Sequence, residues 1–348
     1  TSFISVIIIA ILSIWFFFAI KIRKEYIKSF QLKLKQTGLG KEDKKINIAN
    51  ESVINGLIKV LENGTENQIL WVLLKSREKP NETLFNPVLH LLQHPSGKVR
   101  AEVLRNLYFF QNKAINEAVY QMINDPVQEV KICAFEYLLE HHPENRIELM
   151  QKFLSDTNYK ISAAALLSLA GELRNNPELK KQYELRQIVK EKIEGLHLEE
   201  NPEIKIFNTK ILLETIGKGN MPGFFNFIEK GLNHSKPEIV NQAIKAAGLS
   251  MSPEFIDKLV SFISEEEYSD NAANALAHYG VEILTFLQAM LEDNTKLEVH
   301  RKIPAIVEKI ESQRSVSFLF ELLDSEDFPI RNNALASLGH LKACYPFL

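Results

Sequence analysis

Two short runs in the sequence contain residue types that bind phosphate or metal ions in other proteins, but their spacing does not suit that chemistry. Gly217-Lys218-Gly219 lacks the preceding strand and the following Ser or Thr of a phosphate-binding loop, GxxxxGK[ST]. We expect it to be a loop between repeated units. His141 and His142 are adjacent, so their side chains diverge by about 100° on a helix and do not share a metal ion. We expect the pair to end a helix just before a proline, where cationic or polar groups complement the helix dipole.

Acidic and aromatic clusters are expected to have structural roles. Glu265–Glu267 reads as the solvated N-terminal turn of a helix, and the aromatic runs Tyr108–Phe110 and Phe224–Phe225 read as core packing at helix ends. Cys133 and Cys344 have no CxxC spacing and are expected to be buried or half-buried thiols. The sequence therefore predicts no catalytic site, metal site or cofactor, and we do not expect an enzyme.

The charge of the chain is unevenly distributed. The formal net charge is −3, yet nine basic and three acidic residues fall between Lys21 and Lys45, so residues 46–348 sum to −9. A nucleic-acid-binding surface needs a basic face. Nucleic acid is therefore not an expected partner.

Residues 3–20, FISVIIIAILSIWFFFAI, form an uncharged apolar segment. As a helix its 18 residues would be about 27 Å long, close to a hydrocarbon core of about 30 Å. A secretory signal peptide is a poorer match, because basic residues follow the segment and no Ala-x-Ala site appears. A buried core helix is also a poorer match, because such helices are rarely apolar all round. The segment is therefore predicted to span a membrane and contact lipid.

Basic residues directly after this segment predict its orientation. By the positive-inside rule they place the C-terminal side in the cytoplasm. The membrane-orienting residues are Lys21, Arg23, Lys24 and Lys28.

The rest of the chain is repetitive. LLQHPSGKVRAEVLRNL (91–107), MINDPVQEVKICAFEYL (122–138), FLSDTNYKISAAALLSL (153–169) and LLDSEDFPIRNNALASL (322–338) share an apolar helix end, a polar turn and an apolar anchor. A weaker copy lies around Gln68. The anchors recur at intervals near 31 residues, apart from one 43-residue step, at Val99, Val130, Ile161, Ile204, Ile239, Tyr268, Val299 and Ile330.

Each copy is expected to be a helix hairpin. The anchor and positions +4, +5 and +8 share one helical face, as in Ile330, Ala334, Leu335 and Leu338. A single hairpin cannot bury that face, so neighbouring hairpins must stack. Small residues should let the helices approach closely, namely Ala164, Ala165, Ala334 and Ala336. Aspartates in the turns are expected to cap the second helix, namely Asp125, Asp156 and Asp293.

The 43-residue step contains an additional charged segment. Asn176-Pro177 is typical of an N-cap followed by proline, and it predicts a helix running to about Glu194 and ending at Gly195. Basic and acidic residues alternate along it, so a solvated face is favoured over a binding patch. The basic residues are Lys180, Lys181, Arg186, Lys190 and Lys192.

This pattern resembles the HEAT family, including its turn Asp and the basic residue after the anchor, here Arg100, Lys131, Lys205 and Arg331. Other residues occupy that position in the remaining copies, namely Ser162, Val240, Ser269 and His300. The resemblance covers about residues 50–345. Together with the apolar segment at residues 3–20, it predicts an all-α fold: an α-solenoid of about nine HEAT-type helix-hairpin repeats preceded by one transmembrane helix.

The beginning of the chain resembles a further family. The apolar helix with Trp15 and Ala19, the run KIRKEYIKSFQLKLKQTGL (21–39) and the repeats are similar to the junction in bacterial ATP/ADP translocase-type nucleotide transporters. In that family a major-facilitator-like bundle is fused to HEAT repeats, and the nucleotide-binding residues lie in the bundle. None of them maps onto this chain, so nucleotide would be a partner only through a bundle upstream of Thr1.

The two resemblances imply three regions. Residues 1–20 would be the last transmembrane helix of a truncated bundle, 21–45 a basic juxtamembrane helix or linker, and 46–348 a HEAT solenoid truncated at its C-terminus. The expected function is a cytoplasmic regulatory or scaffolding module of a nucleotide exchanger in a bacterial inner membrane. The alternative is a single-span anchored scaffold that binds a protein partner through the solenoid surface and has no transport role.

Overall fold

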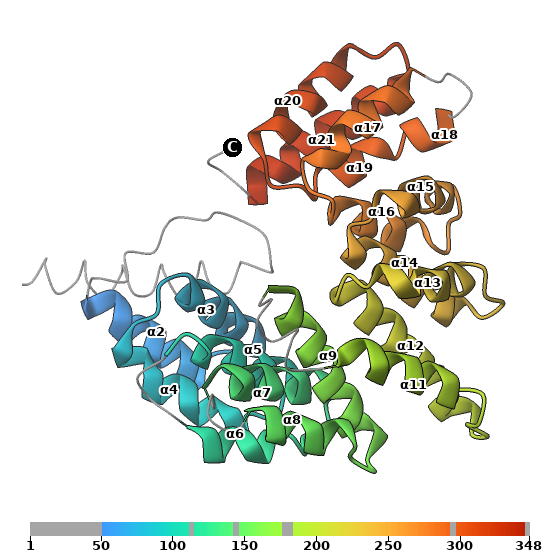
Figure 1. Ribbon diagram of the computed structural model, residues 1–348. Coiled ribbons are helices and arrows are strands. Elements are labelled where there is room, and N and C mark those ends of the chain that lie inside the picture. The colour runs from blue at the N-terminus through green and yellow to red at the C-terminus, as the bar shows by residue number, and fades with distance from the viewer. Residues whose placement is uncertain (1–50, 111–114, 142–145, 176–183, 293–296, 345–348) are drawn as a thin grey trace, which may run out of the picture. The chain divides into compact units, whose positions relative to one another are not determined.

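The computed structural model describes residues 51–110, 115–141, 146–175, 184–292 and 297–344 (Figure 1). Two compact units divide the chain after Phe110. The predicted span, the basic run and its four orienting residues lie outside the described residues. Within the described ranges no helix is long and apolar enough to cross a membrane.

The first unit contains two helix pairs. Helix α2 (Glu51–Asn63) pairs with α3 (Glu66–Glu78), and α4 (Phe85–His90), extended by a 3-10 turn over Leu91–Gln93, pairs with α5 (Gly97–Leu107). A capping box starts α3, because the Thr65 amide donates to Gln68 Oε1 at 2.9 Å. The weak repeat copy around Gln68 is therefore a helix pair, as predicted.

The second unit continues with seven helix pairs in its described residues. The pairs are α6 (Asn116–Met122) with α7 (Gln128–His141), α8 (Arg146–Leu154) with α9 (Tyr159–Asn175), α11 (Leu185–Gly195) with α12 (Pro202–Lys218), α13 (Phe225–Leu232) with α14 (Pro237–Ser250), α15 (Ile256–Ile263) with α16 (Ser269–Ala277), α17 (Glu282–Leu291) with α18 (Leu297–His300) and α19 (Ile303–Val307), and α20 (Gln313–Glu321) with α21 (Phe328–Cys344).

Only helices, 3-10 turns and loops occur in the described residues, so they form an all-α helical-repeat solenoid. Most first helices lie against the second helix of the same pair, as α13 does against α14 (Figure 1). The second helices also contact one another in order, from α7 through α9, α12, α14 and α16 to α19 and α21. Stacking of neighbours therefore builds the core, as a repeat architecture requires.

The anchor positions lie at or near the start of the second helices. Six anchors are buried and two are half-buried, namely Ile204 and Tyr268. The face predicted for α5 is wholly buried. The face predicted for α21 is not, because Leu335 is 62% exposed and Leu338 is only half-buried. Ala336, which was expected to let helices approach, is also exposed. Leu335 lies five positions after its anchor, and the residues at the same position in α7, α9 and α14 are buried. Among the described residues no helix pair follows α21.

Several local predictions need correction. Gly217 and Lys218 form the last turn of α12 instead of a loop, because the missing Cβ of Gly217 lets the helix lie against Ala246 of α14. Phe109 is exposed, whereas Phe110 and Phe225 are buried as expected. Glu265–Glu267 are exposed, but they lie in the turn before α16 and not in its first turn.

Other local predictions are confirmed. Helix α7 ends at His141, and α11 ends at Gly195. Cys133 is buried. The side chains of His142 and Cys344, the cap residue Asp293 and the start of the charged segment at 176–183 lie outside the described residues.

Candidate functional site

The basic residue after the anchor binds its own turn in three helix pairs. Arg100 Nη1 donates to the carbonyl oxygens of His94 at 2.7 Å and Pro95 at 2.9 Å. Arg331 Nη1 donates to the carbonyl oxygens of Ser325 at 2.6 Å and Glu326 at 3.0 Å. Lys131 Nζ donates to the carbonyl oxygen of Asp125. These contacts satisfy turn carbonyls that would otherwise lack donors.

The turn aspartates accept hydrogen bonds from amides of the turn, whereas they were predicted to cap the second helix. Asp125 Oδ1 accepts from the Val127 amide at 2.8 Å, and Asp156 Oδ1 accepts from the Asn158 amide at 2.7 Å. Both amides lie just before the second helix, so these carboxylates close the turn and do not cap the helix itself. Burial lowers the pKa of Lys131, and the nearby Asp125 opposes that effect.

The fourth pair departs from this arrangement. Ser162 takes the place of the basic residue, and its hydroxyl donates to the Leu154 carbonyl oxygen at 2.8 Å. Lys192, from α11 of the next pair, reaches the same place. Its Nζ lies 2.9 Å from Ser162 Oγ and 3.4 Å from the Leu154 oxygen. A lysine from the following pair therefore supplies the cation that this pair lacks.

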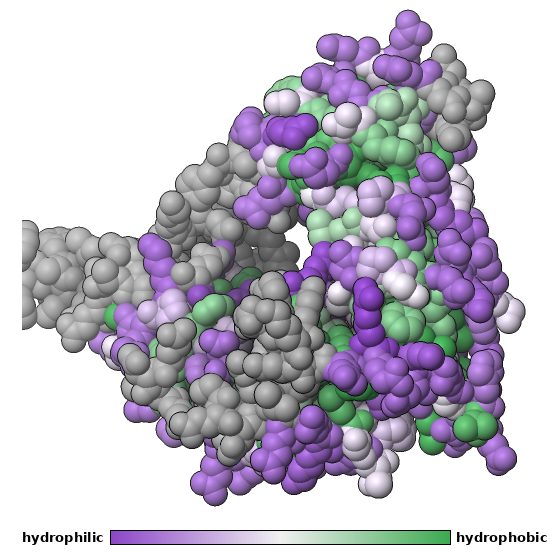
Figure 2. Space-filling view, in the orientation of Figure 1, coloured by the Kyte–Doolittle hydropathy of each residue, from purple (hydrophilic) through white to green (hydrophobic). Residues whose placement is uncertain are grey.

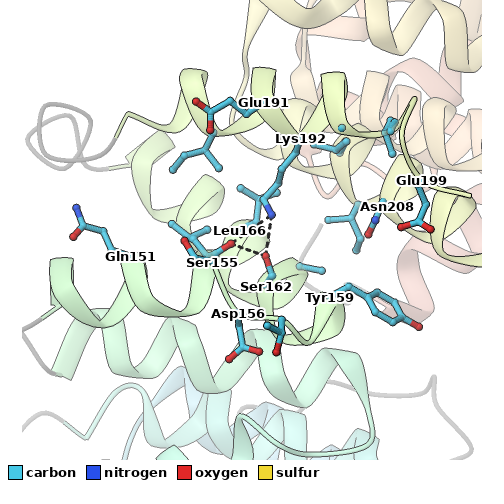
Figure 3. A pocket seen from close by; sticks show the side chains of 18 residues that line it. Gln151, Ser155, Asp156, Tyr159, Ser162, Leu166, Glu191, Lys192, Glu199 and Asn208 are labelled. Atoms are coloured by element: carbon cyan, nitrogen blue, oxygen red, sulfur yellow. Dashed lines mark hydrogen bonds between the residues drawn. The ribbon is translucent and has the colours of Figure 1, made fainter.

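A pocket of about 540 Å³ surrounds this contact (Figure 3). It is formed by α8 and α9 on one side and α11 and α12 on the other. Its apolar lining includes Leu166, Ile188 and Ile211. Lys192 extends from α11 toward Ser162, and Tyr159 and Asn208 lie at one side of the pocket (Figure 3). Volumes of this size are typical of small-molecule sites.

The pocket is electrostatically mixed. Lys192 is half-buried, and burial lowers its pKa below the ordinary lysine value. No carboxylate among the described residues forms an ion pair with it. Three acidic residues also line the pocket, namely Asp156, Glu191 and Glu199, and Glu191 points away from Ser162 (Figure 3).

A second feature is a polar groove of about 530 Å³ on the second helices α12, α14 and α16. Amides lie at its centre, where Asn271 Nδ2 donates to Asn241 Oδ1 at 2.6 Å. Charged residues flank them, and Lys245 Nζ lies 2.9 Å from Glu214 Oε1. We call this the amide groove; it is lined by Lys210, Glu238, Asn241, Gln242, Lys245, Asn271, Asn274, Ala275 and His278. Among the coloured residues of Figure 2, hydrophilic side chains predominate, with apolar patches between them.

The sequence did not predict the residues of the Lys192 pocket or of the amide groove as a site. Lys192 was expected on a solvated face, and the structure instead places it half-buried in the pocket. The sequence feature that could have indicated it is Ser162, which stands where four other copies have a basic residue. Lys205 has the predicted residue type but is exposed. The amide groove had no signal, because its amides come from two separate repeats, on α14 and α16.

No protein-family profile matches the sequence, and no curated protein is significantly similar to it. Three similar solved structures show how far the likeness extends. Human deoxyhypusine hydroxylase in complex with glycerol is 12% identical with a TM-score of 0.37, over 83% of this chain and 96% of that one. An engineered protein is 16% identical with a TM-score of 0.28, over 84% and 80%. Importin beta in an ammonium sulfate condition is 13% identical with a TM-score of 0.32, over 83% and 46%.

This chain thus spans less than half the length of that importin beta chain. It is structurally similar to HEAT-repeat solenoids such as importin beta and deoxyhypusine hydroxylase. At these identities the similarity concerns the fold alone. The described residues themselves form an all-α helical-repeat solenoid.

Proposed function

We propose that this chain is a membrane-attached solenoid that binds a protein partner through the amide groove and carries out no catalysis itself. The groove is the observation that supports the proposal. Its amide and charged side chains join neighbouring second helices, and Asn271 and Asn274 are nevertheless exposed. Side-chain amides both donate and accept hydrogen bonds, so they can pair with the backbone of an extended peptide segment. Three packed helices span roughly 20 Å, which suits about six extended residues.

Photo-crosslinking in cells tests this proposal. A photoreactive amino acid at Asn274, in the groove, should give one discrete crosslinked product with the whole protein, and Asn241→Ala with Asn271→Ala should weaken it. The matched position is Asp257, which is exposed on α15 outside the groove. The crosslinked segment, made as a peptide, should then bind the purified chain. Equal crosslinking at Asp257, or a peptide that ignores the groove substitutions, would contradict the proposal.

The second candidate function is that of a nucleotide-transporter module, and the order of segments in the sequence favours it. An apolar segment, a +6 run and then helical repeats are the arrangement of the nucleotide transporters that the junction resembles. In this proposal the solenoid is a cytoplasmic module of an exchanger in a bacterial inner membrane. A partner on the solenoid could bias transport only by binding two conformations of the transporter with different affinities.

Uptake of labelled ATP or ADP distinguishes the two candidates. Cells expressing the whole gene should accumulate label, and a version ending near Gly38 should do so with altered regulation. A whole gene that encodes one span, or a bundle that moves no nucleotide, would leave the anchored scaffold as the function.

A further inference from the structure

Lys192 places an ammonium group in the pocket, and none of the carboxylates in the lining forms an ion pair with it. An ammonium has three N–H donors, and the described residues provide two acceptors for it, one of them at 3.4 Å. Arg100 and Arg331 differ, because each donates to two backbone carbonyls closer than Lys192 lies to Leu154. Lys192 therefore retains donor capacity toward the pocket that it lines.

The walls around this ammonium restrict the ligand. One lysine compensates one negative charge, and Asp156, Glu191 and Glu199 in the lining would repel a dianion such as a phosphate monoester more strongly than a monoanion. Leu166, Ile188 and Ile211 provide apolar surface beside the cation. A ligand with one anionic group and a hydrocarbon part matches both features.

We propose that this pocket binds an apolar carboxylic acid, with its carboxylate on the Lys192 ammonium beside Ser162 and its hydrocarbon part against Leu166, Ile188 and Ile211. The carboxylate would pair with the Lys192 ammonium, which forms no ion pair with a carboxylate among the described residues. Two sources share this chemistry, a free small acid and the C-terminal carboxylate of a peptide that ends in an apolar residue. The site is separate from the amide groove, so the two proposals fail independently.

Calorimetric titration of the full chain in lipid nanodiscs, with empty nanodiscs as the blank, tests the ligand chemistry. The probe is 3-phenylpropionate, and the neutral control is 3-phenylpropanamide. Losing one partner of a partly buried charge pair weakens binding by roughly thirtyfold or more, so the amide should bind that much more weakly. The peptide acetyl-Gly-Gly-Phe and its C-terminal amide form the second arm. Tighter binding of the peptide acid assigns the site to a protein C-terminus, and tighter binding of phenylpropionate assigns it to a small acid.

Variants test the residue. Lys192→Met keeps most of the side-chain volume and should abolish the preference for acid over amide, whereas Lys190→Met, exposed on the same helix, should retain it. Ser162→Lys introduces a basic residue at the position after the anchor. The new lysine should bind its own turn, repel Lys192 and remove acid binding. This variant tests the site even if Lys192→Met does not fold. Equal binding of acid and amide, binding of neither acid, or acid binding unchanged in both Lys192→Met and Ser162→Lys would overturn the proposal.

Discussion

At the residue scale, one ion pair joins the last two helix pairs. Arg301 Nη2 lies 3.0 Å from Asp327 Oδ2, and Asp327 Oδ1 accepts from the Ile330 amide at 3.0 Å. The hydrogen bond from Arg301 lowers the pKa of Asp327, and the amide of Ile330 adds to that effect. Asp327 therefore both starts α21 and holds the preceding pair.

Asp327→Asn should make the protein less sensitive to acid. A carboxyl group with a lowered pKa in the folded state stabilises the fold above its ordinary pKa, and that stabilisation is lost as the pH falls through the folded value. Urea unfolding of wild type and variant at about pH 6 and pH 3 measures the effect. The free-energy loss on acidification should be smaller in the variant. An equal loss in both, or an equal effect of Asp257→Asn on exposed α15, would show that the ion pair does not contribute.

Lys192→Met should stabilise the protein at neutral pH. Burial lowers the pKa of Lys192, so the charged form disfavours the folded state. That cost is present below the lowered pKa and disappears as the pH rises toward the ordinary lysine value of 10.5, because the unfolded state then binds more protons. Urea unfolding should show a larger gain at about pH 7 than at about pH 10. A loss of stability at pH 7 would mean that the contact with Ser162 outweighs the desolvation of the ammonium.

At the element scale, two glycines set the spacing of the second helices. A Cβ on Gly217 would lie 2.8 Å from Ala246 Cα, and one on Gly248 would lie 2.6 Å from Ala275 Cα. Both contacts involve backbone, which cannot move aside as a flexible side chain can. Helices α12, α14 and α16 therefore pack at distances that only glycine permits.

Gly217→Ala and Gly248→Ala should each destabilise the protein by about 1–3 kcal/mol, because the added methyl overpacks a helix interface. Gly339→Ala is the matched control. It lies within α21, and its Cβ would meet nothing within 4 Å, so it should stabilise by about 0.5–1 kcal/mol through helix propensity. Thermal unfolding of the three variants measures both signs. If all three variants lost stability, the cause would be the backbone conformation of glycine and not the close approach of the helices.

Leu169→Asp tests the face that stacking buries. Leu169 is fully buried in α9, so an unpaired carboxylate there should cost several kcal/mol, about 4. Leu107→Asp in α5 tests the same face in the first unit. Lys190→Ala, on the exposed side of α11, should change stability by less than about 0.5 kcal/mol. Similar melting shifts for buried and exposed substitutions would mean that the anchor register is wrong.

At the scale of the whole molecule, orientation in the membrane is the testable property. The nine basic residues between Lys21 and Lys45 predict that everything after the apolar segment is cytoplasmic. A reporter that is active only in the cytoplasm, fused after Gln36, should therefore work. Activity of a periplasm-only reporter at the same position would reverse the topology. Replacing Lys21, Arg23, Lys24 and Lys28 with Gln should weaken the preference, because these residues lie nearest the span.

The repeat fold was predictable because its signals are local. Residues four apart share a helix face, and a polar turn recurs about every 31 residues, so the helix pairs and the burial of positions such as Val99 and Val130 follow from the sequence. Such a pattern says that a face is buried but not which residues cover it. Leu335 shows this limit, because it has the pattern of a buried residue and is largely exposed in the structure.

The candidate site depended on tertiary structure. Ser162 and Lys192 are 30 residues apart and belong to different pairs, so their contact exists only because the pair of α11 and α12 stacks on the pair of α8 and α9. Gly217 looked like a loop residue for the same reason, since its role comes from the approach of α14. The sequence by itself determined the helices, their pairing and their apolar faces, through side-chain periodicity. The stacking of one pair on the next decided the pocket, the cation inside it and the amide groove, because those depend on side chains that meet only across helix interfaces.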